Sequence, residues 1–285
     1  MLISVMSCSH KENRINMYKQ NLHTHCTYCD GKDMPEEMIL TAIDKGFDSI
    51  GFSSHSYMPW NGHGLAPKNE KHYRDEIRSL ARKYKGQIDV FCGLEYDVFS
   101  DVDTSDFDYV IGSVHYLEIG GELYGFDRDV AAVRDYIKTH FDGDGMAFCR
   151  EYYDMLSQMP DFGDFDIIGH FDLCVKLNQK IRFVDEASEE YISYAFDAIS
   201  SLRGKIPLFE LNTGCISRGY RTVPYPIPRI LKEFRRQGFG ACITSDCHDS
   251  KDLDCYYNEA KELLLASGFR EIYILTDKGF VPEKI

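Results

Sequence analysis

Short apolar runs that alternate with stretches of helical spacing constrain the fold of this chain most strongly. The apolar or β-rich runs are Met17–His23, Ser49–Ser54, Ile88–Tyr96, Tyr109–His115, Asp166–His170, Pro207–Leu211, Ala241–Thr244 and Glu271–Leu275. The helical stretches between them are Pro35–Lys45, Lys68–Tyr84, Val130–His140, Ala147–Gln158, Glu186–Leu202, Pro228–Gln237 and Asp252–Ser267. Strands that alternate with helices form parallel βαβ units, and about seven or eight such units predict an α/β fold with a closed TIM-like barrel.

The length and the absence of a linker favour one barrel over two domains. The chain has 285 residues, which is ordinary for a single α/β barrel, and no Pro/Gly/Ser-rich linker divides it. We therefore expect a single barrel domain over residues 17–285. Residues 1–16 lack periodicity and are expected to be an N-terminal extension. The Gly- and Asp-rich segment Ile119–Gly145 is expected to be a long excursion after one strand.

Composition narrows the class of protein. The net charge of −14 argues against a nucleic-acid track, which needs clustered Lys and Arg. No stretch reaches the ~18 apolar residues of a membrane-spanning helix. The run MLISVM at the N-terminus is shorter than the roughly 7–15 apolar residues of a signal peptide. We therefore expect a cytoplasmic protein with no membrane partner, whose ten scattered cysteines stay reduced.

Residues that ligate metals recur at the downstream ends of the predicted strands. Six of the ten histidines and three carboxylates take such places: His23, His25, Asp30, His55, Glu95, His115, His170, Asp246 and His248. Since the carboxyl ends of parallel barrel strands meet on one face, these side chains are expected to converge there. A strand that ends in H-x-H directs both imidazoles to the same side, so His23 and His25 can reach one ion.

This donor set predicts a metal centre. Imidazole nitrogen and carboxylate oxygen suit zinc, iron and manganese, and a carboxylate can bridge two ions. Paired ions about 3.5–4 Å apart can hold a hydroxide nucleophile and bind a phosphoryl oxygen. The other interpretation of Asp30 is a turn residue before Gly31. Asp172, two residues after His170, is either a carboxylate that orients an imidazole or a surface charge at the barrel rim.

Competing catalytic motifs find little support. Cys26 and Cys29 form a single C-x-x-C with no second copy to complete a four-cysteine zinc site, and the pair lies between His25 and Asp30. Neither a G-x-S-x-G elbow nor a G-x-x-x-x-G-K-[ST] loop is present in the sequence. Serine hydrolase and P-loop chemistry are therefore not predicted.

The ordered motifs resemble those of the PHP family, the polymerase and histidinol phosphatase group. The motifs are H-x-H at His23–His25, D-G at Asp30, S-x-H at Ser53–His55, G-L-E at Gly93–Glu95, S-V-H at Ser113–His115, G-H at Gly169–His170 and S-D-x-H at Ser245–His248. They span nearly the whole chain and are specific as a set. Within the family the chain looks most like the stand-alone histidinol-phosphatases, which also carry segments similar to Glu210–Thr213.

The resemblance implies a distorted (β/α)7 barrel with two or three divalent metal ions, Zn, Mn or Fe. One ion would be held by His23, His25, Glu95 and Asp246. Glu95 would bridge to a second ion, held also by His115 and His170. A third ion would be held by Asp30, His55 and His248, where some relatives have His in place of the Asp.

The resemblance also implies hydrolysis of a small phosphate monoester, L-histidinol phosphate, in histidine biosynthesis. A hydroxide that bridges the first two metals would attack phosphorus. Candidate substrate-binding residues are the cations Lys176, Arg218 and Arg221 and the loop residues Tyr57, Trp60 and Asp97. Arg218 stands as a substitute for an arginine that some relatives carry at the position of Gly214.

Three alternatives to this function stay open. One is a PHP-type phosphatase or phosphodiesterase that acts on nucleotides or nucleic-acid ends. Another is a metal-binding domain without catalytic activity. The third is a metallo-hydrolase of amides, because the same metal set can polarise a carbonyl.

Overall fold

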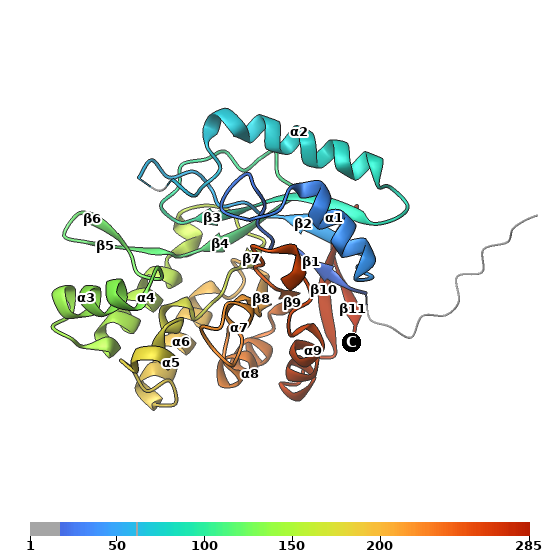
Figure 1. Cartoon of the computed structure of the whole chain (residues 1–285). Helices are drawn as coiled ribbons and strands as arrows, with labels where there is room; N and C mark the ends of the chain where they lie inside the picture. The colour runs from blue at the N-terminus through green and yellow to red at the C-terminus, as the bar shows by residue number, and fades with distance from the viewer. Residues whose placement is uncertain (1–17, 61) are drawn as a thin grey trace, which may run out of the picture.

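The computed structural model describes residues 18–60 and 62–285 (Figure 1). The expected N-terminal extension over residues 1–16 and the start of the first predicted strand at Met17 lie outside the described residues. Within the described part of the chain, no helix is both long and apolar enough to cross a membrane.

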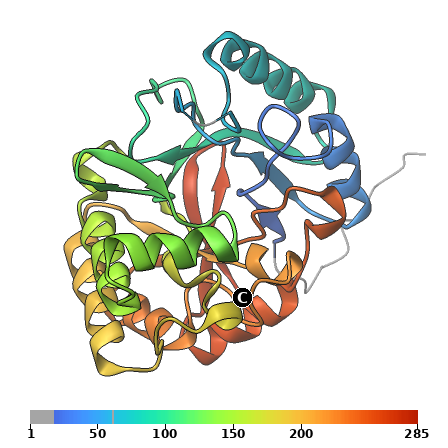
Figure 2. The same ribbon diagram turned by 60° about the vertical axis from the view of Figure 1, so that its left-hand side comes forward.

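Seven parallel strands form one sheet that curls into a barrel. Their spatial order is β1 (Gln20–Asn21), β2 (Ser49–Phe52), β3 (Asp89–Asp97), β4 (Tyr109–Ser113), β7 (Ile167–Ile168), β8 (Leu208–Asn212) and β9 (Gly240–Thr244). The first and last strands meet just beyond their ends, where Thr24 and Cys247 form a parallel bridge and the His25 N–H donates to the Cys247 carbonyl at 2.9 Å. The predicted distorted (β/α)7 barrel is confirmed, and its strands lie inside a ring of helices (Figure 2).

Each predicted helical stretch overlaps a helix, whereas the four-residue helices α5 and α7 were not predicted. The helices are α1 (Pro35–Asp44), α2 (Pro67–Lys83), α3 (Val130–His140), α4 (Gly145–Ser157), α5 (Asn178–Ile181), α6 (Glu189–Leu202), α7 (Gly214–Ser217), α8 (Pro228–Gln237) and α9 (Tyr257–Ala266). Helix α8 shows why the spacing of apolar residues predicts a helix. Its residues Ile230, Leu231 and Phe234 lie on one face, and that face is buried. It ends at Gly238, whose φ of +89° is a conformation that glycine adopts without steric cost.

The last predicted strand does not join the barrel. The run Glu271–Leu275 forms β10 (Glu271–Thr276), which pairs antiparallel with β11 (Gly279–Lys284). Leu275 belongs to a buried cluster with Leu22, Tyr109, Ile111, Ile167, Leu208 and Cys242, of which Tyr109, Ile167 and Leu208 are the first residues of their strands. The Gln20 side chain ties this hairpin to β1 through both the carbonyl and the N–H of Leu275, at 2.9 and 2.7 Å. The hairpin therefore closes the end of the barrel opposite the predicted site.

A hairpin that the sequence pattern did not indicate follows β4 and overlaps the start of the predicted excursion over Ile119–Gly145. Strands β5 (Tyr116–Ile119) and β6 (Glu122–Gly125) pair antiparallel around Gly120 and Gly121. Both glycines have positive φ, which a two-residue type I′ turn requires. The hairpin projects from the barrel beside α3 and α4 (Figure 1), and residues at its base line the cavity at the barrel mouth.

Candidate metal centre

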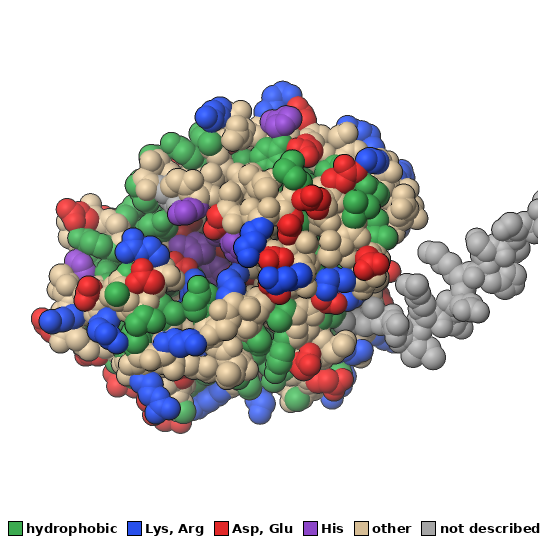
Figure 3. All heavy atoms as spheres, in the orientation of Figure 1, with side chains coloured by type: hydrophobic (Ala, Val, Ile, Leu, Met, Phe, Trp, Pro, Cys, Tyr) green, Lys and Arg blue, Asp and Glu red, His purple; other side chains and the backbone are tan. Residues whose placement is uncertain are grey.

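The carboxyl ends of the barrel strands surround a cavity of about 460 Å³. Its lining includes Asp30, His55, Glu95, His115, His170, Asp246 and His248. Figure 3 shows histidines gathered in this hollow, with Lys, Arg, Asp and Glu side chains around its edge. All nine residues that the strand-end pattern selected lie in or directly beneath this cavity, as the distances below show.

Glu95 lies at the centre of the cluster. Its side chain is 1% exposed. Oxygen Oε2 lies 2.7 Å from His55 Nδ1, 3.2 Å from His23 Nε2 and 3.5 Å from His25 Nε2. Oxygen Oε1 lies 2.9 Å from His170 Nε2 and 3.4 Å from His115 Nε2. The two oxygens therefore face different imidazoles, which is the arrangement a bridging carboxylate needs.

The first group of donors combines His23, His25, Glu95 and Asp246. The Asp246 Oδ1 oxygen lies 3.1 Å from His25 Nε2 and 3.7 Å from His23 Nε2. Three of the facing atoms, His23 Nε2, His25 Nε2 and Glu95 Oε2, are buried and make no hydrogen bond of good geometry, although His55 Nδ1 lies 2.7 Å from Glu95 Oε2. They lie within 4.8 Å of one another. Buried polar atoms without partners are costly, and a cation held between them would satisfy all three.

A second group lies on the other side of Glu95 and differs slightly from the prediction. His115 and His170 face Glu95 Oε1, as expected. His55, which was assigned to the third ion only, contacts Glu95 Oε2, the oxygen that also faces the first group, and donor atoms of His55, Glu95 and His115 lie within 4.8 Å of one another. The reason is that His55 forms a parallel bridge with Glu95 beyond the end of β2.

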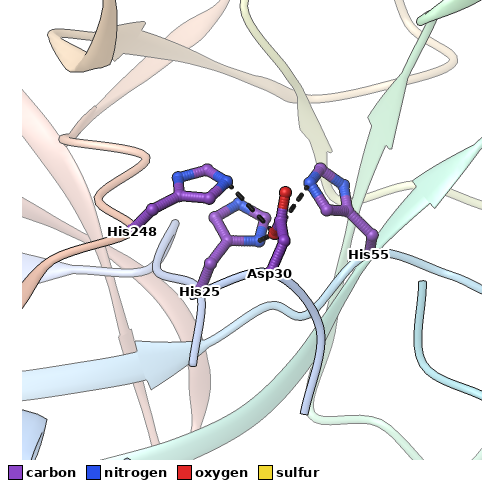
Figure 4. A group of neighbouring side chains, drawn as sticks. All are labelled: His25, Asp30, His55 and His248. Carbon is purple, nitrogen blue, oxygen red and sulfur yellow. Dashed lines mark ion pairs between the residues drawn. The ribbon is translucent and has the colours of Figure 1, made fainter. Parts of the chain in front are cut away.

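The third group surrounds Asp30 (Figure 4). The Asp30 Oδ1 oxygen lies 3.3 Å from His248 Nε2, 3.6 Å from His55 Nε2 and 3.9 Å from His25 Nδ1. Asp30 therefore points into the cluster, and its place in a turn does not explain its position. His25 faces two groups, with Nε2 toward Asp246 and Nδ1 toward Asp30. This group is the more open one, since the Asp30 side chain is 32% exposed.

The cluster concentrates charge in a buried place. Burial alone would raise the pKa of Glu95, but the surrounding imidazoles hold it well below its usual range. Burial alone would lower the pKa of His55, but the Glu95 carboxylate beside it raises that pKa to about 10. Burial and two neighbouring imidazoles lower the pKa of His25 to about 3. The carboxylates are therefore ionised and hold protons on some of the imidazoles, which divalent cations could replace.

Carboxylates behind the cluster contact its imidazoles. Glu210, on β8, lies 2.8 Å from His23 Nδ1. Asp97 lies 3.3 Å from His115 Nδ1 and also accepts the His115 N–H, so it supports an imidazole. Asp172 does neither of the things expected of it, because it is fully buried and accepts a hydrogen bond from the Ile227 N–H. The available signal for Glu210 was a charged residue inside an apolar strand.

The predicted substrate-binding residues divide into two sets. Lys176, Arg218 and Asp97 line the cavity. Arg221 does not line it, because its buried side chain binds Glu186 and the Val175 carbonyl. Tyr57 and Trp60 are also absent from the lining, although Trp60 packs its ring edge-on against Tyr116, which does line the cavity.

Several residues of the cavity lining were not anticipated from the sequence, and one of them, Asp127, forms an ion pair there. Asp127, directly after the β5–β6 hairpin, lines the cavity and binds Lys176 Nζ at 2.9 Å. The nearby Lys176 and His115 cations outweigh the effect of burial and lower the pKa of Asp127 to about 2. The segment around it showed only a Gly- and Asp-rich pattern, which did not indicate that the chain returns to the barrel mouth.

The C-x-x-C pair is reduced in this structure. Cys26 and Cys29 are both free thiols. The Cys29 sulfur lies 3.4 Å from His25 Nδ1, and Cys26 is buried beside Ser54.

Comparison of this chain with known proteins places it in one protein family. The PHP domain family matches residues 21–213. A "Probable histidinol-phosphatase" from Deinococcus radiodurans is 27% identical over 265 residues, which cover 88% of this chain and 94% of that protein. The histidinol-phosphatase of Lactococcus lactis is 24% identical, over 90% of this chain and 94% of that protein.

Solved structures show the same fold. The structure of histidinol phosphate phosphatase from Lactococcus lactis, in complex with Zn, L-histidinol and phosphate, superposes with a TM-score of 0.72. The match covers 93% of this chain and all of that chain, at 22% sequence identity. This chain therefore shares its overall fold with that solved structure.

Proposed function

Because this chain belongs to the PHP domain family, we propose that it is a metal-dependent phosphomonoesterase that hydrolyses L-histidinol phosphate to L-histidinol and phosphate. The observation that carries the proposal is the convergence of six imidazoles and three carboxylates at the mouth of the barrel, with Glu95 at their centre. The named histidinol-phosphatases that match nearly the whole chain support the substrate and its place in histidine biosynthesis.

The donor set fits two or three divalent ions, Zn, Mn or Fe. His23, His25, Glu95 and Asp246 would hold the first, and Glu95 would bridge to a second held by His115 and His170. Asp30, His55 and His248 would hold the third. Such ions bind phosphoryl oxygens and lower the pKa of water from near 16 to roughly 7, which supplies a nucleophile at neutral pH.

The protein's own side chains would bind the rest of the substrate. Arg218 donates to the Asp246 side chain at 2.9 Å while it lines the cavity, so its guanidinium can hold Asp246 in place and face a phosphate oxygen. A Cβ at Gly214 would lie 2.9 Å from the Arg218 guanidinium, so the absence of a side chain at 214 leaves room for that guanidinium.

The Lys176–Asp127 ion pair suits a substrate that carries both charges. L-Histidinol phosphate has a phosphate and, two carbons from its ester oxygen, an ammonium group. Lys176 would bind the phosphate and Asp127 the ammonium, so each would exchange its present partner for a substrate charge. An uncharged cavity wall would not distinguish this amine from an alkyl group.

A substrate panel tests the proposal. Phosphate release would be measured on L-histidinol phosphate, nucleoside monophosphates and single-stranded DNA, with Zn, Mn or Fe added and with chelated enzyme as the control. We expect kcat/KM for L-histidinol phosphate to exceed that for nucleotides by at least about tenfold, equivalent to about 1.4 kcal/mol. Preference for a nucleotide or for DNA would contradict the proposed substrate, and no turnover of any phosphate ester would contradict the activity.

A further inference from the structure

The Glu210 carboxylate is fully buried under the metal centre and contacts both of its sides. Oxygen Oε2 lies 2.8 Å from His23 Nδ1 and accepts from the Thr244 hydroxyl at 2.8 Å. Oxygen Oε1 accepts from the His170 backbone N–H at 2.6 Å and from the Asn212 amide at 2.8 Å. One side chain on β8 thus connects the segments that follow β1 and β7 with the last residue of β9.

Both neighbours of Glu210 Oε1 can only donate hydrogen bonds to it. The His170 N–H is always a donor. The Asn212 amide must present its NH₂ group, because its own oxygen accepts the Gly214 N–H at 2.9 Å. An ionised carboxylate has about four acceptor sites, and four neighbours fill them here. Such a carboxylate offers no proton to His23, so the Nδ1 atom of His23 must carry one.

We infer that Glu210 is a positioning residue of the metal centre, which keeps a proton on Nδ1 of His23 and so leaves Nε2 as the atom that binds metal. The geometry agrees with this role, since His23 Nε2 is buried, has no hydrogen-bond partner and faces Glu95 and Asp246. Carboxylates that hold the second nitrogen of a metal-binding imidazole typically change metal affinity 10–100-fold when replaced. The inference rests on the proposed metal site and is independent of the proposed substrate.

The other carboxylate oxygen of Glu210, Oε1, contacts a proposed ligand of the second ion. Because Oε1 accepts the His170 N–H, the same carboxylate positions the backbone of a proposed ligand of the second ion. Glutamine at 210 would turn its NH₂ group toward one of two donor pairs. If the NH₂ group faced His23 and Thr244, it would meet the proton on His23 Nδ1, so two donors would face each other. If it faced His170, it would meet the backbone N–H, which can only donate.

The test compares Glu210→Gln with Thr244→Val. Thr244→Val removes one donor to the same oxygen but keeps the carboxylate and the His23 contact. Zinc would be titrated into each metal-free protein in competition with a chromophoric chelator, and the fold would be checked by circular dichroism. We expect Glu210→Gln to weaken the tightest zinc site by about 10–100-fold and Thr244→Val to weaken it by less than about threefold. Wild-type zinc affinity in folded Glu210→Gln would overturn the inference.

A measurement on the wild-type protein covers the case in which Glu210→Gln does not fold. A long-range ¹H–¹⁵N spectrum of the zinc-loaded protein reports which His23 nitrogen carries the proton. The inference requires a proton on Nδ1 and metal on Nε2. The reverse assignment would overturn it. Neither readout involves substrate, so a failure here is distinct from the absence of phosphatase activity.

Discussion

Replacement of Glu95 by glutamine removes the charge that the cluster surrounds. Five imidazole nitrogens lie between 2.7 and 3.5 Å from the two Glu95 oxygens. Glutamine would keep the size of the side chain, lose its negative charge and place an NH₂ group against atoms that should bind metal. Removal of one partner from a buried charged pair costs about 3–5 kcal/mol. If this energy is lost from the transition state, kcat/KM should fall by roughly 10²–10⁴-fold.

His248→Ala provides the comparison. The His248 side chain is 23% exposed and belongs to the more open group, in which His25, Asp30 and His55 would remain. Solvent-exposed ion pairs contribute about 0–1 kcal/mol of interaction free energy. If this energy is lost from the transition state, kcat/KM should fall by at most about fivefold.

The assay is steady-state phosphate release at saturating metal. Glu118→Gln on the exposed face of β5 makes the same chemical change away from the cavity and should leave kcat/KM unchanged. Metal content of each variant would be measured in parallel. Equal and mild losses from Glu95→Gln and His248→Ala would refute the bridging role of Glu95.

Three further predictions concern the cavity, the protons of the centre and the barrel floor. Lys176→Met should lower kcat/KM for L-histidinol phosphate about tenfold through loss of one charged hydrogen bond, while Lys180→Met should not; equal steady-state constants for both would contradict this. Because the pKa of His55 is raised to about 10, the metal-free protein holds that proton at pH 7.5, and metal binding must release it. Zinc affinity should therefore rise with pH, and calorimetric heats should differ between buffers of different ionisation enthalpy; identical heats would count against this. Leu275→Ala should cost about 2–5 kcal/mol of unfolding free energy in urea without a change in zinc content, and a loss of zinc would contradict a purely structural role.

The positions of the cluster residues could be predicted because parallel strands impose a simple rule. Every barrel strand ends on the same face, so a histidine at each strand end predicts convergence without knowledge of any distance. His23, His115 and Asp246 come together for this reason, although they are far apart in the chain. That His55 contacts two groups of donors could not be predicted. It depends on the backbone bridge between His55 and Glu95, which the sequence pattern does not indicate.

The eighth apolar run shows where the pattern is ambiguous. Glu271–Leu275 has the composition of a barrel strand, but the chain turns back at Asp277 and Lys278, and β10 pairs with β11. A short apolar run has the same periodicity whether it pairs with a barrel strand or with the segment that follows it. The β5–β6 hairpin was missed because the flanking residues are mixed and only the Gly120–Gly121 pair marked a turn.

The sequence also did not predict which way individual charged side chains point. Arg218 and Arg221 lie three residues apart in one loop, yet one lines the cavity and the other is buried against Glu186. The candidate cations were equivalent by charge, and only the packing around them separates their roles. Glu210 was missed for a related reason, because nothing in a strand pattern tells whether a buried carboxylate supports an imidazole.

Anomalous X-ray scattering from crystals grown with zinc tests the central claim most directly. The account predicts a peak bound by His23 Nε2, His25 Nε2 and Glu95, and a second peak on the other oxygen of Glu95, next to His170. A map without a peak at Glu95, in a protein whose turnover survives a chelator, would contradict it.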